Sequence, residues 1–325
     1  MESRLFAGVL LVALCTVAAA SQGAEPTYPS RPIRLLIPFP AGGAADLIGR
    51  TLGEKLSAQF GQPVVVDNRP GAGGSLATEL LAKSQPDGYT LMVGMAGPIS
   101  ISPSVNSHLT YNVARDITPL TRVSETLNVV VVNPSLEVSD VRGFIDWANK
   151  HRGNVKYGTS GIGQFDHLAG EYFIRLAGIP MTAVPYKGNG PALVDLISNQ
   201  INITFPPYIV AAPFVRTGRL RALAVTTAER QPLLPDLPTV AETVPKFALS
   251  NWNGMFAPGK LAPGIADRLH DGIVKALKEP DVVQRFHQNG MEPVSSPTRA
   301  DFTAFVKADT ERWARIVRDA HLKFD

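Results

Sequence analysis

Four glycine-rich turns carry the residue types best suited to chemistry in this chain. The first spans residues 38–46 and joins an apolar stretch of strand character to the start of a helix. A turn of this kind points unpaired backbone N–H groups, and the positive end of the helix dipole, at whatever lies in front of it. It is therefore a candidate anion-binding seat, made of Phe39, Pro40, Ala41, Gly42 and Gly43.

Three further turns, at residues 69–75, 158–167 and 187–191, repeat this pattern of strand, glycine and helix. Any one of them could serve only to let a strand meet a helix. Four turns in equivalent places favour a binding role, because ligands of α/β sheets gather at the carboxyl ends of the strands. The candidate ligand-contacting residues in these three turns are Ser75, Thr159, Ser160, Gly161, Phe165, His167 and Asn189.

Two candidate residues titrate in the acidic to neutral range. Asp46 ends the first turn, where a carboxylate stabilises a helix N-terminus by about 0.3–1 kcal/mol. Because it would repel an anionic ligand, we expect it to act indirectly, by orienting a loop amide or a water. His167 lies in the first turn of its helix, where capping and ligand contact are equally open roles. Phe39, Phe165 and Tyr186 adjoin the turns, so these aromatic rings and Trp252 could wall an apolar ligand body.

The glycine patterns do not match common cofactor or catalytic motifs. Dinucleotide-binding turns require Gly or Ala at the position that Leu76 occupies. Residues 158–161 approach a nucleophile elbow, but Ile162 stands where the closing glycine is needed. A secreted serine hydrolase that uses Ser160 stays open as an alternative function.

Composition excludes other classes. The chain has 31 Lys and Arg against 28 Asp and Glu, a net charge of +3, and no basic cluster with interleaved aromatics. We therefore expect no nucleic-acid partner. No pair of histidines has metal-ligand spacing and no acidic loop resembles a calcium site, so we expect neither a metal nor a cofactor.

The residues between the turns predict the elements that position them. Ile48, Leu52, Leu56 and Phe60 recur at helical spacing, and Gly61 ends that helix. Strands and helices alternate with short connections, which predicts mainly parallel sheets flanked by helices. Other local expectations are a helix with Leu76, Leu80 and Leu81 on its apolar side, an irregular loop at 97–112, a buried strand at 128–133 that crosses into a second lobe, and Ser139 as the cap of the next helix.

The same pattern recurs after residue 156, and the chain returns to the first lobe near residue 247. We therefore expect an α/β protein of two lobes with the ligand cleft between them. Residues 24–126 and 247–325 would form lobe 1, and residues 127–246 lobe 2.

The N-terminal segment reads as an export signal. Residues 5–20 are apolar and end in Ala18, Ala19 and Ala20, which offer a cleavage site. The only cysteine, Cys15, lies inside this segment, so the mature chain has no thiol chemistry. We expect residues 1–23 to be a signal peptide, cleaved near residues 20–24, and the protein to be periplasmic.

Several sequence blocks run in a consistent order along the mature chain. They are residues 28–33 and 38–43 with Asp46 and Arg50, then residues 67–74, 86–91, 167–171, 184–188 and 218–224, and finally Trp313. In these blocks the chain resembles the extracytoplasmic solute receptors of the tripartite tricarboxylate transporter family, also called Bug or TctC-like receptors.

The resemblance implies a periplasmic-binding-protein fold of type II whose two lobes close on a carboxylate. Loop main-chain groups and ordered water of the first lobe would hold the carboxylate, and second-lobe side chains would adapt to the rest of the ligand. Such a receptor is monomeric, has no catalytic residue, and delivers its ligand to the permease subunits of a tripartite tricarboxylate transporter. A receptor that reports its ligand to a membrane sensor is an alternative.

One position departs from the family pattern. An acidic residue often follows the strand at 201–205 in these receptors, but here Pro206 and Pro207 follow it. Proline offers neither a charge nor an N–H group. We therefore expect Pro206 at the floor of the site and a ligand without an amino group, such as an aliphatic or aromatic mono- or dicarboxylate.

Overall fold

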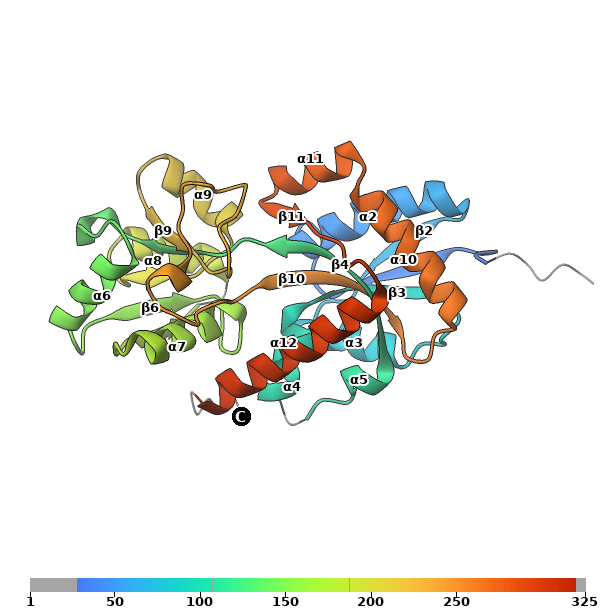
Figure 1. Ribbon diagram of the computed structural model, residues 1–325, viewed down its shortest axis with the longest axis horizontal. Coiled ribbons are helices and arrows are strands. Elements are labelled where there is room, and N and C mark those ends of the chain that lie inside the picture. Colours follow the sequence, from blue (N-terminus) through green and yellow to red (C-terminus); the bar gives the residue numbers. More distant parts are fainter. Residues whose placement is uncertain (1–27, 107, 187, 320–325) are drawn as a thin grey trace, which may run out of the picture.

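Two mixed β-sheets, each covered by helices on both faces, form the two lobes of the chain (Figure 1). The computed structural model describes residues 28–106, 108–186 and 188–319. The expected signal peptide, its cleavage site and Cys15 lie outside these residues. No helix within them is long and apolar enough to cross a membrane.

The first sheet has six strands in the order β11-β4-β10-β3-β1-β2. β1 runs parallel to β2 and β3, whereas β10 is antiparallel to both β3 and β4. The strands are β1 (Ile33–Ile37), β2 (Val64–Asn68), β3 (Thr90–Met95), β4 (Ile117–Thr126), β10 (Asn251–Pro258) and β11 (Met291–Pro293).

The second sheet repeats this plan with five strands in the order β7-β6-β8-β5-β9. β6 runs parallel to β7 and β8, and β5 is antiparallel to β8 and β9. Each lobe thus has three parallel strands followed by an antiparallel one. The strands are β5 (Val129–Val132), β6 (Lys156–Thr159), β7 (Thr182–Pro185), β8 (Ile203–Thr204) and β9 (Arg221–Val225).

In each lobe, alternate residues of a strand pack into the apolar layers on the two faces of the sheet. In β1, Ile33, Leu35 and Ile37 pack against α2 and α10, while Leu36 packs with α3 and α12 on the other face. All of β5 is buried because its alternate valines enter two different clusters in the same way. The first-lobe helices are α2 (Ala44–Phe60), α3 (Ser75–Ala82), α4 (Ser102–Val105), α5 (Val113–Asp116), α10 (Pro263–Leu277), α11 (Pro280–Gln288) and α12 (Arg299–Asp319). Those of the second lobe are α6 (Val141–Lys150), α7 (Phe165–Ala177), α8 (Asn189–Ile197) and α9 (Tyr208–Arg216).

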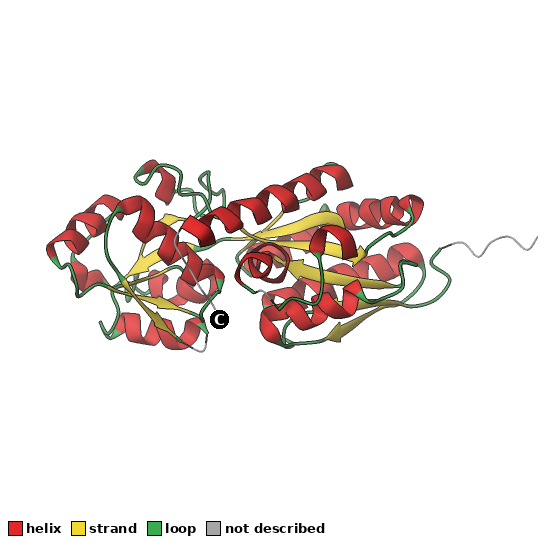
Figure 2. Cartoon of the chain, turned by 90° about the horizontal axis from the view of Figure 1, so that it is seen from below, coloured by secondary structure: helices red, strands yellow, loops and turns green. Residues whose placement is uncertain are grey.

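Helix α12 reaches from one lobe to the other, as the view from below shows (Figure 2). Its first half places Phe302 and Val306 in a first-lobe cluster with Trp252. Its last turns place Trp313 and Ile316 in the main core of the second lobe. The expected lobe 1 segment 247–325 therefore ends in a helix that packs on both lobes.

Several local predictions are confirmed and others are wrong. α2 buries Ile48, Leu52 and Leu56 and ends at Gly61, which has the left-handed φ of 67°. Leu76, by contrast, is 42% exposed, because the turn before α3 sets the helix phase so that Ala77 and Leu81 face the core.

The cap of α6 is Asp140 and not Ser139. The Asp140 carboxylate accepts a 2.7 Å hydrogen bond from the Gly143 amide, since the helix begins one residue later than expected. Residues 97–112 are more ordered than a loop: they contain a short π-helix over Gly97–Ile101, the short helix α4, and Asn112, which caps α5. Strand β4 and helix α9 were not predicted; α9 contains Pro213, a residue that normally interrupts helices.

Candidate functional site

A cavity of about 610 Å³ lies between the lobes, and residues of all four glycine-rich turns line it. Its volume is in the range of ligand pockets for small molecules. First-lobe and crossing residues in the lining are Phe39, Pro40, Ala41, Gly42, Gly43, Ala44, Ala45, Gly73, Met95, Gly97, Pro98, Asn128 and Asn251. The second lobe contributes Ser160, Gln164, Phe165, Asp166, Asn189 and Pro207.

The first wall is the N-terminus of α2. Gly43 is the N-cap residue of this helix, and no described side chain caps it. The first amides of a helix have no partner within the helix, so here they remain for another acceptor. Because Gly43, Ala44 and Ala45 line the cavity, this helix end directs main-chain donors and a positive dipole end into it, an arrangement that suits an anion.

Asp46 stabilises this turn through hydrogen bonds and is not part of the cavity lining. Its carboxylate accepts hydrogen bonds from the Gly42 amide (3.0 Å), from Arg50 Nε (2.9 Å) and from Asn68 Nδ2 (3.0 Å). The hydrogen bond from Arg50 is the largest cause that lowers the pKa of Asp46 to about 2. The ionised carboxylate therefore fixes the conformation of the anion-facing turn.

The second turn approaches the cavity through Gly73 and needs glycine at residue 74. Gly74 has a φ of +97°, and a Cβ there would lie 3.1 Å from Pro98 and 3.2 Å from Pro38. Ser75 is outside the lining, and its hydroxyl contacts Tyr111 Oη at 3.3 Å.

The opposite wall is the turn from β6 to α7, and it contains a buried carboxylate. Asp166 lines the cavity and is only 3% exposed. It accepts hydrogen bonds from the Ser160 amide at 2.6 Å and from the Ser160 hydroxyl at 2.9 Å. Burial raises the pKa of Asp166, against the lowering effect of these Ser160 donors.

Thr159 and Gly161 serve the internal structure of this turn and lie outside the lining. The Thr159 hydroxyl donates to the Gly161 carbonyl at 2.8 Å. His167 is also outside the lining: its Nδ1 accepts from the Gly163 amide at 3.0 Å, and its ring stacks on Tyr157. Burial lowers the pKa of His167, which favours the neutral ring that can accept this bond.

Ser160 and His167 do not form the pair that a serine nucleophile requires. The Ser160 hydroxyl donates to Asp166, while His167 faces Gly163. Nucleophile and base must lie within hydrogen-bond reach of one another. The geometry thus gives no support to the hydrolase alternative.

The remaining predicted residues divide between the cavity and its surroundings. Phe165 lines the cavity and makes an edge-to-face contact with Trp313 of α12, with ring centroids 6.0 Å apart. Asn189 also lines it, and within the part of the chain that the structure describes its buried Oδ1 has no hydrogen-bond partner. Tyr186 lies outside the lining and donates its hydroxyl to Asp195 at 2.7 Å.

The floor of the cavity differs from the expectation by one residue. Pro206 is buried, and its carbonyl accepts a hydrogen bond from Val129 across the sheet. Pro207, paired with Asn128 as an isolated bridge, is the proline that lines the cavity. Because successive residues of an extended chain face opposite ways, only one of the two can face the ligand.

Two asparagines at the crossing segments were missed. Asn128 Oδ1 accepts from Asn251 Nδ2 at 3.1 Å, and Asn128 Nδ2 donates to the Phe205 carbonyl at 2.8 Å. Both line the cavity. Asn251 is the first residue of β10 and Asn128 directly precedes β5, but no local pattern in the sequence indicates that the two side chains meet.

The cavity lining carries few ionisable side chains. Among its described residues, Asp166 is the only one with an ionisable side chain. Elsewhere in those parts of the chain, no cluster of His, Cys, Asp or Glu could hold a metal ion. An anion bound to the described lining is therefore held by hydrogen bonds from amides and not by an ion pair.

The chain matches a known protein family. Residues 48–322 match the family described as "Tripartite tricarboxylate transporter family receptor" (TctC). Protein BugT of Bordetella pertussis is 35% identical over 323 residues, which cover 99% of this chain and 98% of BugT.

Two solved structures share the fold, and their sequence identity to this chain is close to that of BugT. Rpa4515 of R. palustris, solved with adipate, is 33% identical with a TM-score of 0.79, covering 91% of this chain and 99% of that one. MatC (Rpa3494) from Rhodopseudomonas palustris, solved with bound malate, is 29% identical with a TM-score of 0.75, covering 89% and 100%.

Proposed function

This chain belongs to the receptor family of the tripartite tricarboxylate transporters, whose members are periplasmic solute-binding receptors and not enzymes, and we propose that its own solute is a small organic carboxylate. The observation that carries this proposal is the uncapped N-terminus of α2, which faces the cavity between the lobes. Adipate in Rpa4515 and malate in MatC support the same ligand class.

In the proposed mode of binding, the carboxylate accepts hydrogen bonds from the first amides of α2, near Gly43, while the rest of the ligand lies against Phe39 and Phe165. Closing the lobes removes water from the cavity. Hydrogen bonds to an anion strengthen in this less polar surrounding. The proposed lobes are residues 24–126 with 247–325, and residues 127–246, joined at crossing segments that carry Asn128 and Asn251.

The proposed partners are the membrane permease subunits of a tripartite tricarboxylate transporter, in agreement with the family description. The proposed form is an exported, monomeric receptor. Delivery to a permease would be tested by deleting the gene and measuring uptake of the radiolabelled ligand once that ligand has been identified.

Isothermal titration calorimetry with a panel of carboxylates tests the ligand class. We expect heat of binding for at least one of them in the wild-type protein, and none in the variant Gly43→Leu. A Cβ at Gly43 meets only the Pro40 carbonyl, at 3.8 Å, so the larger side chain fits the fold but covers the amides. Gly264→Leu is the matched control, because a Cβ there meets no atom within 4 Å and residue 264 lies outside the cavity lining. Equal binding by Gly43→Leu and wild type would contradict the proposal.

A further inference from the structure

The two walls of the cavity are not equivalent. At α2 the N-terminus has no side-chain cap, and Asp46 points to the back of the turn. At α7 no side chain caps the helix in the usual way either, but the Asp166 carboxylate lies at the second residue of the helix and lines the cavity. One helix end is thus open to an anion, whereas the other has an anion of the chain itself beside it.

Asp166 uses the donors that this wall would otherwise offer. The Ser160 amide and the Ser160 hydroxyl both donate to it, at 2.6 and 2.9 Å, and the His167 amide lies 3.0 Å from its Oδ1. The Thr159 hydroxyl lies 3.3 Å from the same oxygen. A carboxylate has about four lone-pair positions, so these contacts leave little capacity for ligand donors. The wall therefore presents negative charge and few free donors.

A second polar group on this side has unused hydrogen-bonding capacity. Asn189, the first residue of α8, lines the cavity, and its buried Oδ1 has no hydrogen-bond partner among the described residues. Leaving a buried polar atom unpaired is costly, so a ligand that supplies a hydrogen bond there is favoured. A neutral hydroxyl can donate a hydrogen bond to this oxygen, and unlike a carboxylate it is not repelled by Asp166.

We propose that Asp166 determines the specificity of the receptor by occupying the anion position of the second-lobe wall, so that the ligand has one carboxylate, at α2, and a neutral, hydroxyl-bearing far end. This inference rests on the proposed carboxylate-binding function and deepens it. The far end lies among Asp166, Asn189 and Gln164, while the carboxylate lies at the α2 wall. A dicarboxylate would place its second charge beside Asp166.

Matched ligands that differ only at the far end test this directly. Calorimetry would compare hexanoate, 6-hydroxyhexanoate and adipate, together with the shorter set butanoate, 4-hydroxybutanoate and succinate and the aromatic set benzoate, 4-hydroxybenzoate and terephthalate. In the set whose length fits, we expect the hydroxy acid to bind most tightly. The dicarboxylate should bind at least about 10-fold more weakly, because like charges placed together in an interface are strongly unfavourable.

The variant Asp166→Asn keeps the size of the side chain and removes its charge. We expect it to raise the affinity for the dicarboxylate about 10-fold and to change that for the hydroxy acid less than about 3-fold, since only the former meets the charge. Ser160→Ala is the control: it removes one hydrogen bond to Asp166 but keeps the charge, so the discrimination should persist. Circular dichroism and the melting temperature verify that each variant folds, and Asp166→Ser replaces Asp166→Asn if that variant does not.

Three results would count against these statements in different ways. Equal or tighter binding of a dicarboxylate by the wild-type protein would overturn the inference and leave the carboxylate function standing. Selectivity that survives unchanged in the folded Asp166 variants would overturn the role of Asp166. If no carboxylate of the three sets gives heat or a thermal shift, the proposed function itself fails, and the inference fails with it.

Discussion

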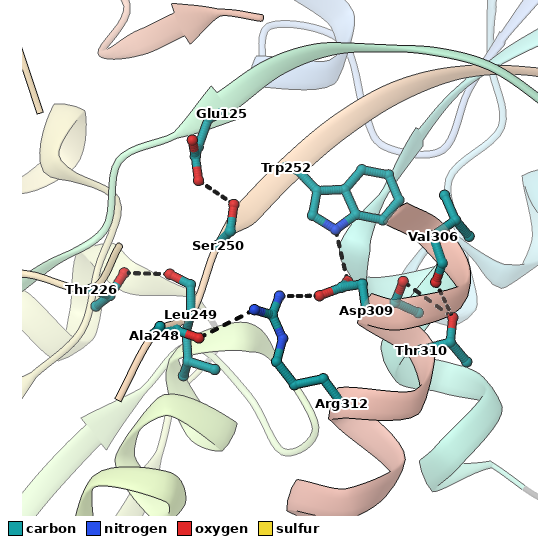
Figure 3. A network of polar contacts seen from close by, with 11 residues as sticks. Glu125, Thr226, Ala248, Leu249, Ser250, Trp252, Val306, Asp309, Thr310 and Arg312 are labelled. Carbon is teal, nitrogen blue, oxygen red and sulfur yellow. Dashed lines mark hydrogen bonds and ion pairs between the residues drawn. The ribbon is translucent and has the colours of Figure 1, made fainter. Parts of the chain in front are cut away.

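The indole Nε1 of Trp252 donates a 2.8 Å hydrogen bond to Oδ2 of Asp309, which joins strand β10 to helix α12 (Figure 3). Asp309 is only 2% exposed and also forms an ion pair with Arg312. Arg312 in turn donates to the Ala248 carbonyl at 3.4 Å, and Ser250 nearby donates to Glu125 of β4. A chain of polar contacts thus links α12 to the segment by which the chain returns from the second lobe.

The first prediction concerns this link. Trp252→Phe should lower the free energy of unfolding by about 1–3 kcal/mol, because the buried Asp309 carboxylate loses one of its two partners. Urea denaturation at pH 7 measures the change. Trp147→Phe is the control: this half-buried indole stacks on His151, and its replacement should cost less than about 1 kcal/mol. Equal losses for both variants would contradict the prediction.

The lowered pKa of Asp46 predicts that the protein loses stability at low pH. Its pKa in the folded protein, about 2, lies below the ordinary value of 3.8. Its contribution to stability is therefore complete above about pH 4 and is lost as the pH falls toward about 2. Because the partner Arg50 is 56% exposed and screened by solvent, we expect Asp46→Asn to lose about 1–2 kcal/mol at pH 7.

Urea unfolding of wild type and Asp46→Asn at pH 7, 4 and 3 checks this prediction. The gap between the two proteins should narrow at the lowest pH. Asp267→Asn, which breaks an exposed ion pair with Arg299, is the control and should stay near wild type throughout. A gap that is constant with pH would mean that the charge of Asp46 does not contribute.

The lowered pKa of His167 predicts that stability also depends on pH in a range nearer neutrality. Burial lowers its pKa in the folded protein, although the charge of Glu171 opposes this. A histidine of lowered pKa contributes its full stability above the unfolded value of 6.5, and this stability declines as the pH falls below that value. Protonation also removes the Nδ1 lone pair that accepts from Gly163. His167→Asn, whose side-chain oxygen can accept the same bond, should reduce the loss of melting temperature between pH 7.5 and 5.5.

The backbone conformation of Gly74 predicts that only glycine is well tolerated at this position beside the cavity. Gly74→Ala should destabilise the fold by about 1–3 kcal/mol, because its φ of +97° is strained for alanine and the new Cβ would crowd Pro38 and Pro98. Since Pro98 lines the cavity, ligand affinity should fall as well. Gly97→Ala is the control, as Gly97 also lines the cavity but has room for a Cβ. Thermal unfolding and calorimetry with the ligand that binds most tightly separate the two variants.

The elements that the sequence could predict are those governed by local rules. Helix α2 follows from apolar residues at helical spacing and from Gly61, and the four turns follow from glycines between strands and helices. Helix α9 could not be found this way, because Pro213 lies inside it, and an interior proline normally argues against a helix. Strand β4 mixes polar and apolar residues and becomes buried only through β10, α10 and α12, which come much later in the chain.

The parts of the site that were missed depend on partners distant in sequence. Asn128 and Asn251 form their hydrogen bond across 123 residues, and no local pattern indicates it. The choice between Pro206 and Pro207 depends on the register of β5 against the chain beside it. Asp166 lay inside a predicted turn, but its contact with Ser160 is a property of the folded turn and not of residue spacing.

The uncapped N-terminus of α2 has a consequence for how such a receptor evolves. Its donors are main-chain amides, which every residue except proline supplies. Divergence at Ala44 or Ala45 can therefore alter access to these donors but rarely removes them. The opposite wall, by contrast, depends on the side chains of Asp166 and Asn189. A single nucleotide substitution that turns Asp166 into asparagine would alter the charge of that wall, so the preferred solute could change while the main-chain donors proposed to bind its carboxylate stay the same.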